Sequence, residues 1–506
     1  MNRREFLTLA ACGAAGVLFG NEGNALPKGS SSPPNIVYIL ADDLGYGDLG
    51  CLNPESKTPT PNLDRLAAEG IRFTDAHSPA AVCTPTRYGI LTGRYCWRTR
   101  LKNSVLWPWE PPLIEAGRLT VPQMLQQQGY HTACIGKWHL GWDWPTKDGK
   151  PVAEKGTGED VDFTKPIANG PTTRGFDYYF GTAVPNFPPY SFIENDRTVG
   201  IPTAMKPEAM FGWPGPMLEG WHLEAILPGL TEKAVAYLGE RAKEPERPFF
   251  LYFPLTAPHT PIVPAPEFEG KSQAGPYGDF VHQVDWTVGQ VMQALAKHGL
   301  DDNTLVIFTS DNGSPGRNGE NASGPPGSVV QDTGHHPSWK LRGMKADIWD
   351  GGHRIPFLAR WPGRIQPGTA STELICLSDL MATCAAILGE ALPNDAAEDS
   401  YNLLPALLGE ERDGPIREAI VHHSGQGAFA IRQGKWKLIT QLGSGGWTKP
   451  ASPKPEPEGP RGQLYDMEAD LSEQHNLWME KPEVVDRLTQ LLQRYKAEGR
   501  STPPRA

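Results

Sequence analysis

The 506-residue sequence lacks several features that would assign it to common protein classes. It has no basic excess, because 47 Lys and Arg residues stand against 58 Asp and Glu residues, giving a formal net charge of −11. A general nucleic-acid-binding protein would carry basic patches, so we expect no nucleic-acid partner. The seven cysteines show no CxxC spacing and no zinc pattern, and they leave open whether any pair forms a disulfide. The sequence also contains no internal repeats.

A run of apolar residues long enough to span a bilayer is missing as well. The stretch from Phe6 to Gly20 is shorter than the ~20 residues that a membrane helix needs, so no stable membrane span is expected. It follows Arg3-Arg4-Glu5-Phe6-Leu7, which resembles a twin-arginine export signal, and Gly23-Asn24-Ala25 offers a small-residue cleavage site. We therefore expect an export signal over 1–25 and a linker over 26–34. The protein would then be periplasmic or extracellular after passing through the export machinery.

Cys12 offers an alternative to simple cleavage. Leu9-Ala10-Ala11-Cys12 resembles a lipoprotein box, but the apolar run before Cys12 is very short. The usual length of the apolar region favours cleavage near Ala25 over lipid anchoring at Cys12.

Glycine and proline are abundant, with 55 and 50 residues, and indicate many long surface loops. Between these loops, short apolar runs rich in β-branched residues alternate with amphipathic patterns. We expect buried strands at 35–40, 132–135, 249–254 and 304–309, and helices at 62–69, 121–128 and 280–297. This alternation predicts an α/β fold with a doubly wound, mostly parallel sheet sandwiched by helices. Ligands of such folds bind beyond the carboxyl ends of the strands.

Two parts of the chain break the alternation. Residues 142–221 are rich in Pro, Gly and aromatic residues with little periodicity, which predicts an elaborated loop over the site. After Leu408, short strands are expected at 419–422, 428–432, 435–440 and 463–465, followed by a closing helix at 482–496. We therefore expect a main domain over 35–408 and a small C-terminal α+β subdomain over 409–500.

Cys83 lies in the most informative motif of the chain. Cys83-Thr84-Pro85-Thr86-Arg87 is followed closely by Leu91-Thr92-Gly93-Arg94. Proline is well tolerated as the first residue of a helix, so Pro85 is expected to open a helix with Cys83 at its amino end. Backbone N–H groups and the helix dipole favour anions there, and Arg87 adds a permanent charge. The motif suits a nucleophile facing an anionic substrate, although a buried structural cysteine is the alternative.

Acidic residues follow two of the predicted strands. Asp42-Asp43 follows the first strand, and Asp311-Asn312 follows the strand at 304–309. Adjacent carboxylates repel each other unless a cation or proton intervenes, although a helix cap or solvated turn is the simpler alternative. Both clusters would lie at the same edge of a parallel sheet and contain only oxygen ligands. They therefore favour Ca²⁺, or alternatively Mg²⁺, over zinc.

Four further basic residues lie near predicted strand ends or in a long polar segment. Lys137 and His139 alternate across a segment expected to be extended, so both should point to one side. His259 lies between two prolines, and Lys345 lies in the segment 341–356. Each of them alone could be an ordinary surface lysine or a hydrogen-bonded loop histidine.

Together, these segments resemble the type I sulfatases, in which the cysteine of this motif is oxidised to formylglycine. The resemblance spans about residues 35–356 and implies an alkaline-phosphatase-like fold with 35–408 as the catalytic domain. It implies an arylsulfatase-like hydrolase of sulfuric esters, matured by a formylglycine-generating enzyme. Asp350 departs from the family pattern, because many relatives have Glu before the Gly-Gly pair. The resemblance also implies that the modified Cys83 binds Ca²⁺ together with Asp42, Asp43, Asp311 and Asn312.

The resemblance further implies roles for individual residues. Arg87 and Lys137 would steady the formylglycine hydrate, and Asp311 would accept a proton from the attacking hydroxyl. His259, with or without Lys345, would protonate the departing alcohol. His139 would take the proton of the second hydroxyl.

The aromatic residues of 142–221 point to a sulfated sugar as substrate, either a small molecule or an oligosaccharide. Two alternatives remain open from the sequence. One is a phosphodiesterase or phosphonate hydrolase of the same fold, and the other is a non-catalytic exported carbohydrate-binding protein.

Overall fold

The computed structural model describes residues 33–505. The expected export signal, the cleavage site near Ala25 and Cys12 lie outside this range. Among the described residues, none of the helices combines the length and the apolar composition needed to cross a lipid bilayer.

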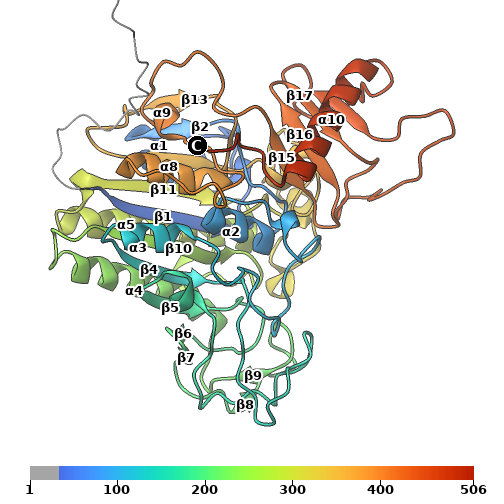
Figure 1. The fold of residues 1–506 in the computed structure, drawn as a ribbon. Coiled ribbons are helices and arrows are strands. Elements are labelled where there is room, and N and C mark those ends of the chain that lie inside the picture. The colour runs from blue at the N-terminus through green and yellow to red at the C-terminus, as the bar shows by residue number, and fades with distance from the viewer. Residues whose placement is uncertain (1–32, 506) are drawn as a thin grey trace, which may run out of the picture.

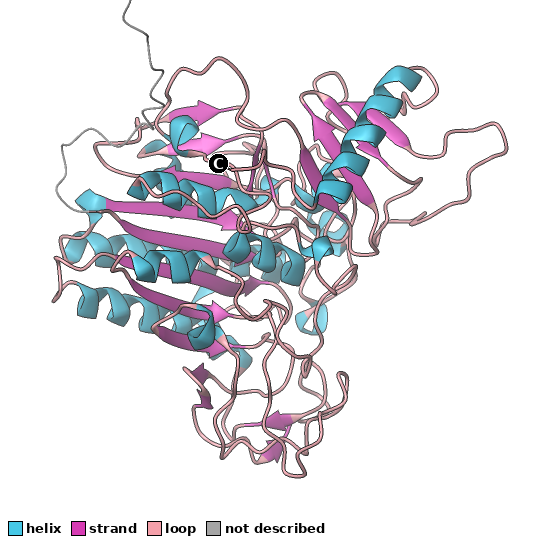
Figure 2. Cartoon of the chain, in the orientation of Figure 1, coloured by secondary structure: helices cyan, strands magenta, loops and turns pink. Residues whose placement is uncertain are grey.

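A ten-stranded mixed sheet forms the centre of the molecule (Figures 1 and 2). Its five middle strands are parallel and lie in the order β11 (Thr304–Ser310), β1 (Asn35–Asp42), β10 (Phe249–Pro258), β4 (His131–Lys137) and β5 (Tyr178–Thr182). On the β11 side the sheet continues with β12 (Phe357–Arg360), β2 (Ile71–Phe73) and β13 (Thr369–Ser371), and beyond β5 with β6 (Ile193–Glu194) and β7 (Arg197–Thr198). The predicted doubly wound, mostly parallel sheet is confirmed.

Helices cover both faces of this sheet, because successive side chains of a buried strand point to opposite sides. On β1, Ile36, Tyr38 and Leu40 pack with helices α2 (Cys83–Thr92), α3 (Val121–Gln127) and α8 (Leu380–Leu388). The alternate residues Val37, Ile39 and Ala41 pack with α1 (Pro61–Ala68), α4 (Ile226–Arg241) and α5 (Gly275–Lys297). The expected sandwich therefore rests on two apolar layers.

Two predictions about this domain need correction. Helix α5 begins at Gly275 instead of 280, with a proline in its first turn, where the missing N–H costs nothing. The segment 142–221 is not a loop throughout, because it contains β5, which pairs in parallel with β4 in the central sheet. It also contains the short hairpin of β8 (Ala204–Met205) and β9 (Pro216–Met217). The flanking proline-rich sequence concealed a strand of only five residues.

The C-terminal part forms a separate antiparallel sheet, visible at the upper right of Figure 2. Its strands are β15 (Ile420–His423), β16 (Phe429–Gln433), β17 (Trp436–Ile439) and β18 (Gln463–Asp466), in that order. Helix α10 (Pro482–Glu498) packs on this sheet through Leu488, Leu492 and Tyr495. The predicted α+β character is confirmed, whereas the domain boundary at 408–409 stays a prediction.

Candidate active site

The two acidic clusters meet because their strands are neighbours. In the β1–β11 pairing Ala41 is opposite Ser310, so Asp42 and Asp43 leave the sheet beside Asp311 and Asn312. All four side chains are buried. The backbone N–H of Asp43 donates to Asp311 Oδ1 at 3.2 Å, and Asn312 Nδ2 donates to Asp43 Oδ1 at 2.7 Å. The convergence expected from the sequence is therefore present.

Cys83 lies beside this acidic group, at the amino end of α2. The helix begins at Cys83, with Val82 as its N-cap, so the prediction that Pro85 opens the helix was wrong by two residues. Pro85 is still tolerated, because the N–H groups of the first turn have no acceptor within the helix. Ligand atoms of Cys83, Asp42, Asp43 and His259 all lie within 4.8 Å of one another.

Three buried cations balance the carboxylates. Arg87 donates to Asp311 Oδ2 through Nη2 at 2.7 Å and Nε at 3.1 Å, and its Nη2 lies 3.5 Å from Asp42 Oδ1. Lys137 Nζ lies 2.7 Å from Asp42 Oδ2. Lys345 Nζ lies 2.6 Å from Asp43 Oδ1 and 3.7 Å from Cys83 Sγ. Arg87 and Lys137 thus bind carboxylates, and Lys345 is the cation in contact with the cysteine.

The carboxyl groups differ in their protonation. Burial raises the pKa of Asp42, but the charges of Lys137, His259 and Arg87 outweigh burial and hold this pKa well below its usual range. Burial and the neighbouring Asp42 raise the pKa of Asp311 to about 7. Two carboxylates this close ionise together only when additional positive charge is present.

A hard cation fits the oxygen atoms of this group. Asp42 Oδ1 and Asn312 Oδ1 are buried and have no hydrogen-bond donor. A buried acceptor without a partner is costly, and a cation would satisfy both atoms. Because the available ligands are carboxylate and amide oxygens, the group matches the preferences of Ca²⁺ or Mg²⁺.

His139 and His259 approach the site differently. Strand β4 ends at Lys137 and His139 has a φ of 54°, so the extended conformation expected for this segment does not reach His139. His139 Nε2 lies 3.0 Å from the Leu106 carbonyl, whereas its buried Nδ1 has no partner. Burial and the charge of Lys137 lower the pKa of His139, so its ring is neutral at neutral pH. His259 Nε2 lies 3.8 Å from Asp43 Oδ2.

Comparison with known proteins identifies this arrangement. A family model described as Sulfatase matches residues 34–390. The chain belongs to the sulfatase family. It is 36% identical to an N-acetylgalactosamine-6-O-sulfatase of Bacteroides thetaiotaomicron, over 92% of this chain and 94% of that protein. Identity to human arylsulfatase A is also 36%, covering 91% of this chain and 87% of the relative.

A solved structure supports the same assignment. It comes from work on the metabolism of multiple glycosaminoglycans by Bacteroides thetaiotaomicron and superposes with a TM-score of 0.77 at 34% identity. The superposition covers 92% of this chain and all of that structure. The protein is therefore a sulfuric ester hydrolase of the arylsulfatase type with an alkaline-phosphatase-like fold.

Two residues of the sulfatase that were not predicted lie beside the site. The Trp447 ring centre lies 5.8 Å from Lys345 Nζ and 5.6 Å from Arg317 Cζ. The only sequence signal for Trp447 is its position in a glycine-rich stretch, where a tryptophan has little core to enter.

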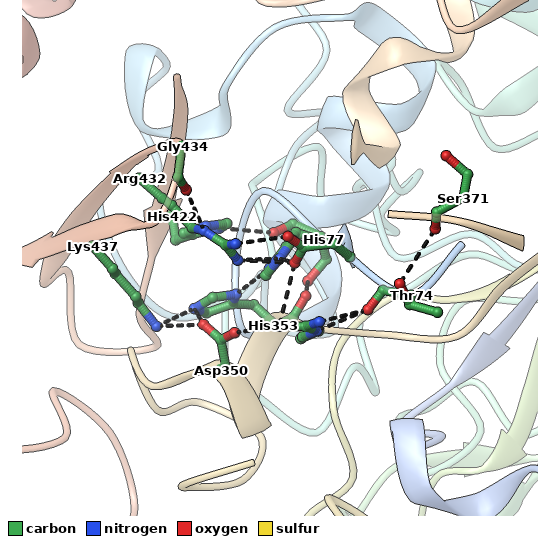
Figure 3. Close-up of polar contacts among 12 residues, drawn as sticks. Thr74, His77, Asp350, His353, Ser371, His422, Arg432, Gly434 and Lys437 are labelled. Carbon is green, nitrogen blue, oxygen red and sulfur yellow. Dashed lines mark hydrogen bonds and ion pairs between the residues drawn. The ribbon is translucent and has the colours of Figure 1, made fainter. Parts of the chain in front are cut away.

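The C-terminal sheet contacts the segment 341–356 through Asp350, and also the segment that follows β2 (Figure 3). Lys437 on β17 reaches Asp350 Oδ1 at 2.7 Å, and Arg432 on β16 pairs with Asp75 at 2.7 Å. The backbone N–H of Asp350 also donates to Glu473 Oε2 at 2.7 Å. Asp350, the departure from the family pattern, therefore takes part in this contact.

Three histidines, His77, His353 and His422, are buried in the same region (Figure 3). His77 Nδ1 and His353 Nδ1 lie 3.0 Å apart. The rings of His353 and His422 stack with centroids 3.8 Å apart and planes inclined by 12°. The nitrogen lone pairs of His353 and His422 lie in two nearly parallel, stacked ring planes and do not converge on one ion. We therefore assign this cluster a role in packing. Burial lowers the pKa of all three rings and favours their neutral forms.

Proposed function

We propose that this sulfatase removes sulfate from an O-sulfated carbohydrate, using a formylglycine made from Cys83 and a bound Ca²⁺. The main support is the convergence beside Cys83 of Asp42, Asp43, Asp311 and Asn312, which include two buried oxygens without donors. The formylglycine hydrate would supply a hydroxyl nucleophile, and the cation would polarise the sulfate oxygens. We also propose export through residues 1–25 and maturation by a formylglycine-generating enzyme.

The protein's own residues would neutralise the anionic substrate and move protons. Lys345 lies between Cys83 and Asp43, where its charge would stabilise a sulfate oxygen. Arg87 and Lys137 would hold Asp311 and Asp42 in place. In this way Arg87 and Lys137 would steady the formylglycine hydrate, as the family resemblance implies.

Proton transfers would involve the two histidines. His259, whose Nε2 lies near Asp43, would protonate the departing alcohol. His139 is neutral and has a free Nδ1, so it would accept a proton from the residue-83 hydrate. Such acid–base assistance typically contributes about 10²–10⁴-fold.

Aromatic side chains beside His139 support a sugar substrate. Phe187 contacts His139 with centroids 6.0 Å apart, and Trp107 lies 5.1 Å from Trp213 in the same cluster. Flat aromatic faces suit the apolar faces of pyranose rings. Because similar proteins include N-acetylgalactosamine-6-sulfatases, the 6-O-sulfate of N-acetylgalactosamine is the first substrate to test.

Mass spectrometry of the Cys83 peptide tests the nucleophile, and the aldehyde mass is expected in protein from the native host. Cys83→Ala should abolish hydrolysis of 4-nitrophenyl sulfate, whereas Cys51→Ala, at a half-buried cysteine, should retain it. Full desulfation by Cys83→Ala would refute the proposal. Faster cleavage of bis(4-nitrophenyl) phosphate, a phosphate diester, than of the sulfate would favour the phosphodiesterase alternative.

A further inference from the structure

We propose that the C-terminal subdomain completes the substrate site, with Trp447 and Arg317 forming a subsite for a sugar unit that carries an anionic substituent. This inference rests on the proposed carbohydrate sulfatase function. It assigns substrate recognition to Trp447, which lies more than 100 residues after Asn312, the last residue of the acidic cluster.

The position of the subsite follows from Lys345. Its ammonium group contacts both Asp43 and Cys83, which places it at the reacting centre. The same ammonium lies 5.8 Å from the centre of the Trp447 ring. A sugar whose sulfate reaches Cys83 therefore extends past this indole.

Trp447 is exposed although its backbone is held firmly. About two fifths of the residue (41%) is accessible, and it is the only aromatic residue among the exposed large hydrophobic residues of 33–505. Its backbone N–H donates to Asp347 Oδ1 at 2.8 Å, and Thr448 Oγ1 donates to Asp347 Oδ2 at 2.5 Å. Asp347 is only two residues from Lys345, so the indole is fixed relative to the catalytic segment.

Close backbone packing fixes the loop further. A Cβ at Gly446 would lie 2.3 Å from the Ala346 carbonyl oxygen, so only glycine allows the loop to approach this closely. An exposed indole on a rigid loop at the edge of an active site is the kind of surface that stacks on a ligand ring.

Arg317 supplies the charge of the subsite. Its Nη1 donates to Ser323 Oγ at 3.3 Å and to the Gly324 carbonyl, which are neutral acceptors. Its hydrogen-bond acceptors within the described part of the chain are neutral, and Asp43 is the carboxylate whose charge acts on its guanidinium. Its Cζ lies 5.6 Å from the Trp447 ring centre. A half-buried guanidinium that forms no close ion pair with the described residues keeps N–H donors for a carboxylate or sulfate on the substrate, although the charge of Asp43 also acts on it.

Three variants and three substrates test this subsite. The substrates are 4-nitrophenyl sulfate, N-acetylgalactosamine 6-sulfate, and a disaccharide in which that sugar is linked to a uronic acid. Trp447→Ala should lower kcat/KM for both sugars relative to the aryl sulfate by about tenfold, mainly through KM, as expected for one well-placed contact. Arg317→Gln should lower kcat/KM for the disaccharide more than for the monosaccharide. Trp447→Phe keeps an aromatic ring and should therefore retain most of the wild-type kcat/KM for both sugars.

Matched controls come from the same subdomain. Met479→Ala removes another exposed apolar side chain, and Arg461→Gln removes an exposed arginine of the Trp447 loop. Both should leave all substrate ratios at wild-type values. If Trp447→Ala lowers the melting temperature, the substrate ratios of Arg317→Gln alone test the subsite.

The outcomes separate this inference from the proposed function. Unchanged substrate ratios in an active Arg317→Gln or Trp447→Ala enzyme would overturn the subsite while leaving the sulfatase mechanism intact. A wild-type enzyme with formylglycine that cleaves the aryl sulfate but neither sugar would overturn the subsite and the carbohydrate substrate together. A mature wild-type enzyme that cleaves none of the three esters would instead refute the proposed function itself.

Discussion

The Lys437→Met substitution tests whether the C-terminal sheet holds the active-site segment in place. Lys437 is buried, and its Nζ lies 2.7 Å from Asp350 Oδ1, 2.8 Å from Glu473 Oε1 and 3.2 Å from His353 Nε2. Burial opposes ionisation of both carboxyl groups. It raises the pKa of Glu473 to about 7, whereas the charge of Lys437 outweighs burial and keeps the pKa of Asp350 low.

Methionine preserves the length of the side chain but removes its charge. Glu473 would then lose its ion pair with Lys437. Among the described residues, Asp350 would keep only the cation Arg354, whose Nη1 lies 3.4 Å from Asp350 Oδ2. Breaking a buried ion pair by removing one partner costs about 3–5 kcal/mol, and we expect a loss of unfolding free energy in this range. Lys345 lies in the adjoining segment, so activity should fall as well.

Lys435→Met is the matched control. Lys435 Nζ lies 2.7 Å from Asp466 Oδ2, the same separation as in the buried pair, but its side chain is 40% exposed. Solvent screens this pair, so its loss should leave the urea midpoint, measured by tryptophan fluorescence, within error of wild type. Equal costs for the two substitutions would refute the reasoning. Adding Glu473→Gln to Lys437→Met should recover part of the loss, because glutamine does not have to take up a proton to be buried without a cation.

Three further outcomes are expected. Chelation of Ca²⁺ should lower both the activity and the melting temperature, and added calcium should restore both. Asp43→Asn should bind calcium more weakly in calorimetry, and unchanged binding by this variant would exclude Asp43 as a ligand. Burial lowers the folded-state pKa of three histidines, His77, His353 and His422, below the unfolded value. The unfolding free energy should therefore be highest above about pH 6.5 and fall with pH below it, by up to ~1.4 kcal/mol per pH unit for each ring. His422→Phe should reduce the slope of melting temperature against pH, and an unchanged slope would contradict this. Gly136→Ala should lower the unfolding free energy, measured in urea, by about 3 kcal/mol, because the new Cβ would lie 1.9 Å from the Pro254 carbonyl oxygen. In the control Gly414→Ala the new Cβ meets no atom within 4 Å, so this variant should be as stable as wild type.

The elements predicted correctly from sequence are those with strong local patterns. The apolar runs of β1 and β11 are typical of buried parallel strands, and acidic residues follow both of them. The errors occurred where local rules were weak. Strand β5 is short and lies within a proline-rich stretch, and the left-handed backbone at His139 has no sequence signal, because this conformation is uncommon for residues other than glycine.

The sequence by itself therefore determined the fold class, the family and the residue types gathered around Cys83, because periodicity and short motifs are local properties of the chain. Only the tertiary structure decided which cation pairs with which carboxylate, and that the Trp447 ring lies beside both Lys345 and Arg317. These contacts join loops that are far apart in the chain. The ion-pair distances depend on the strand order of the central sheet, and the position of Trp447 depends on how the C-terminal sheet packs against it, neither of which a local pattern encodes.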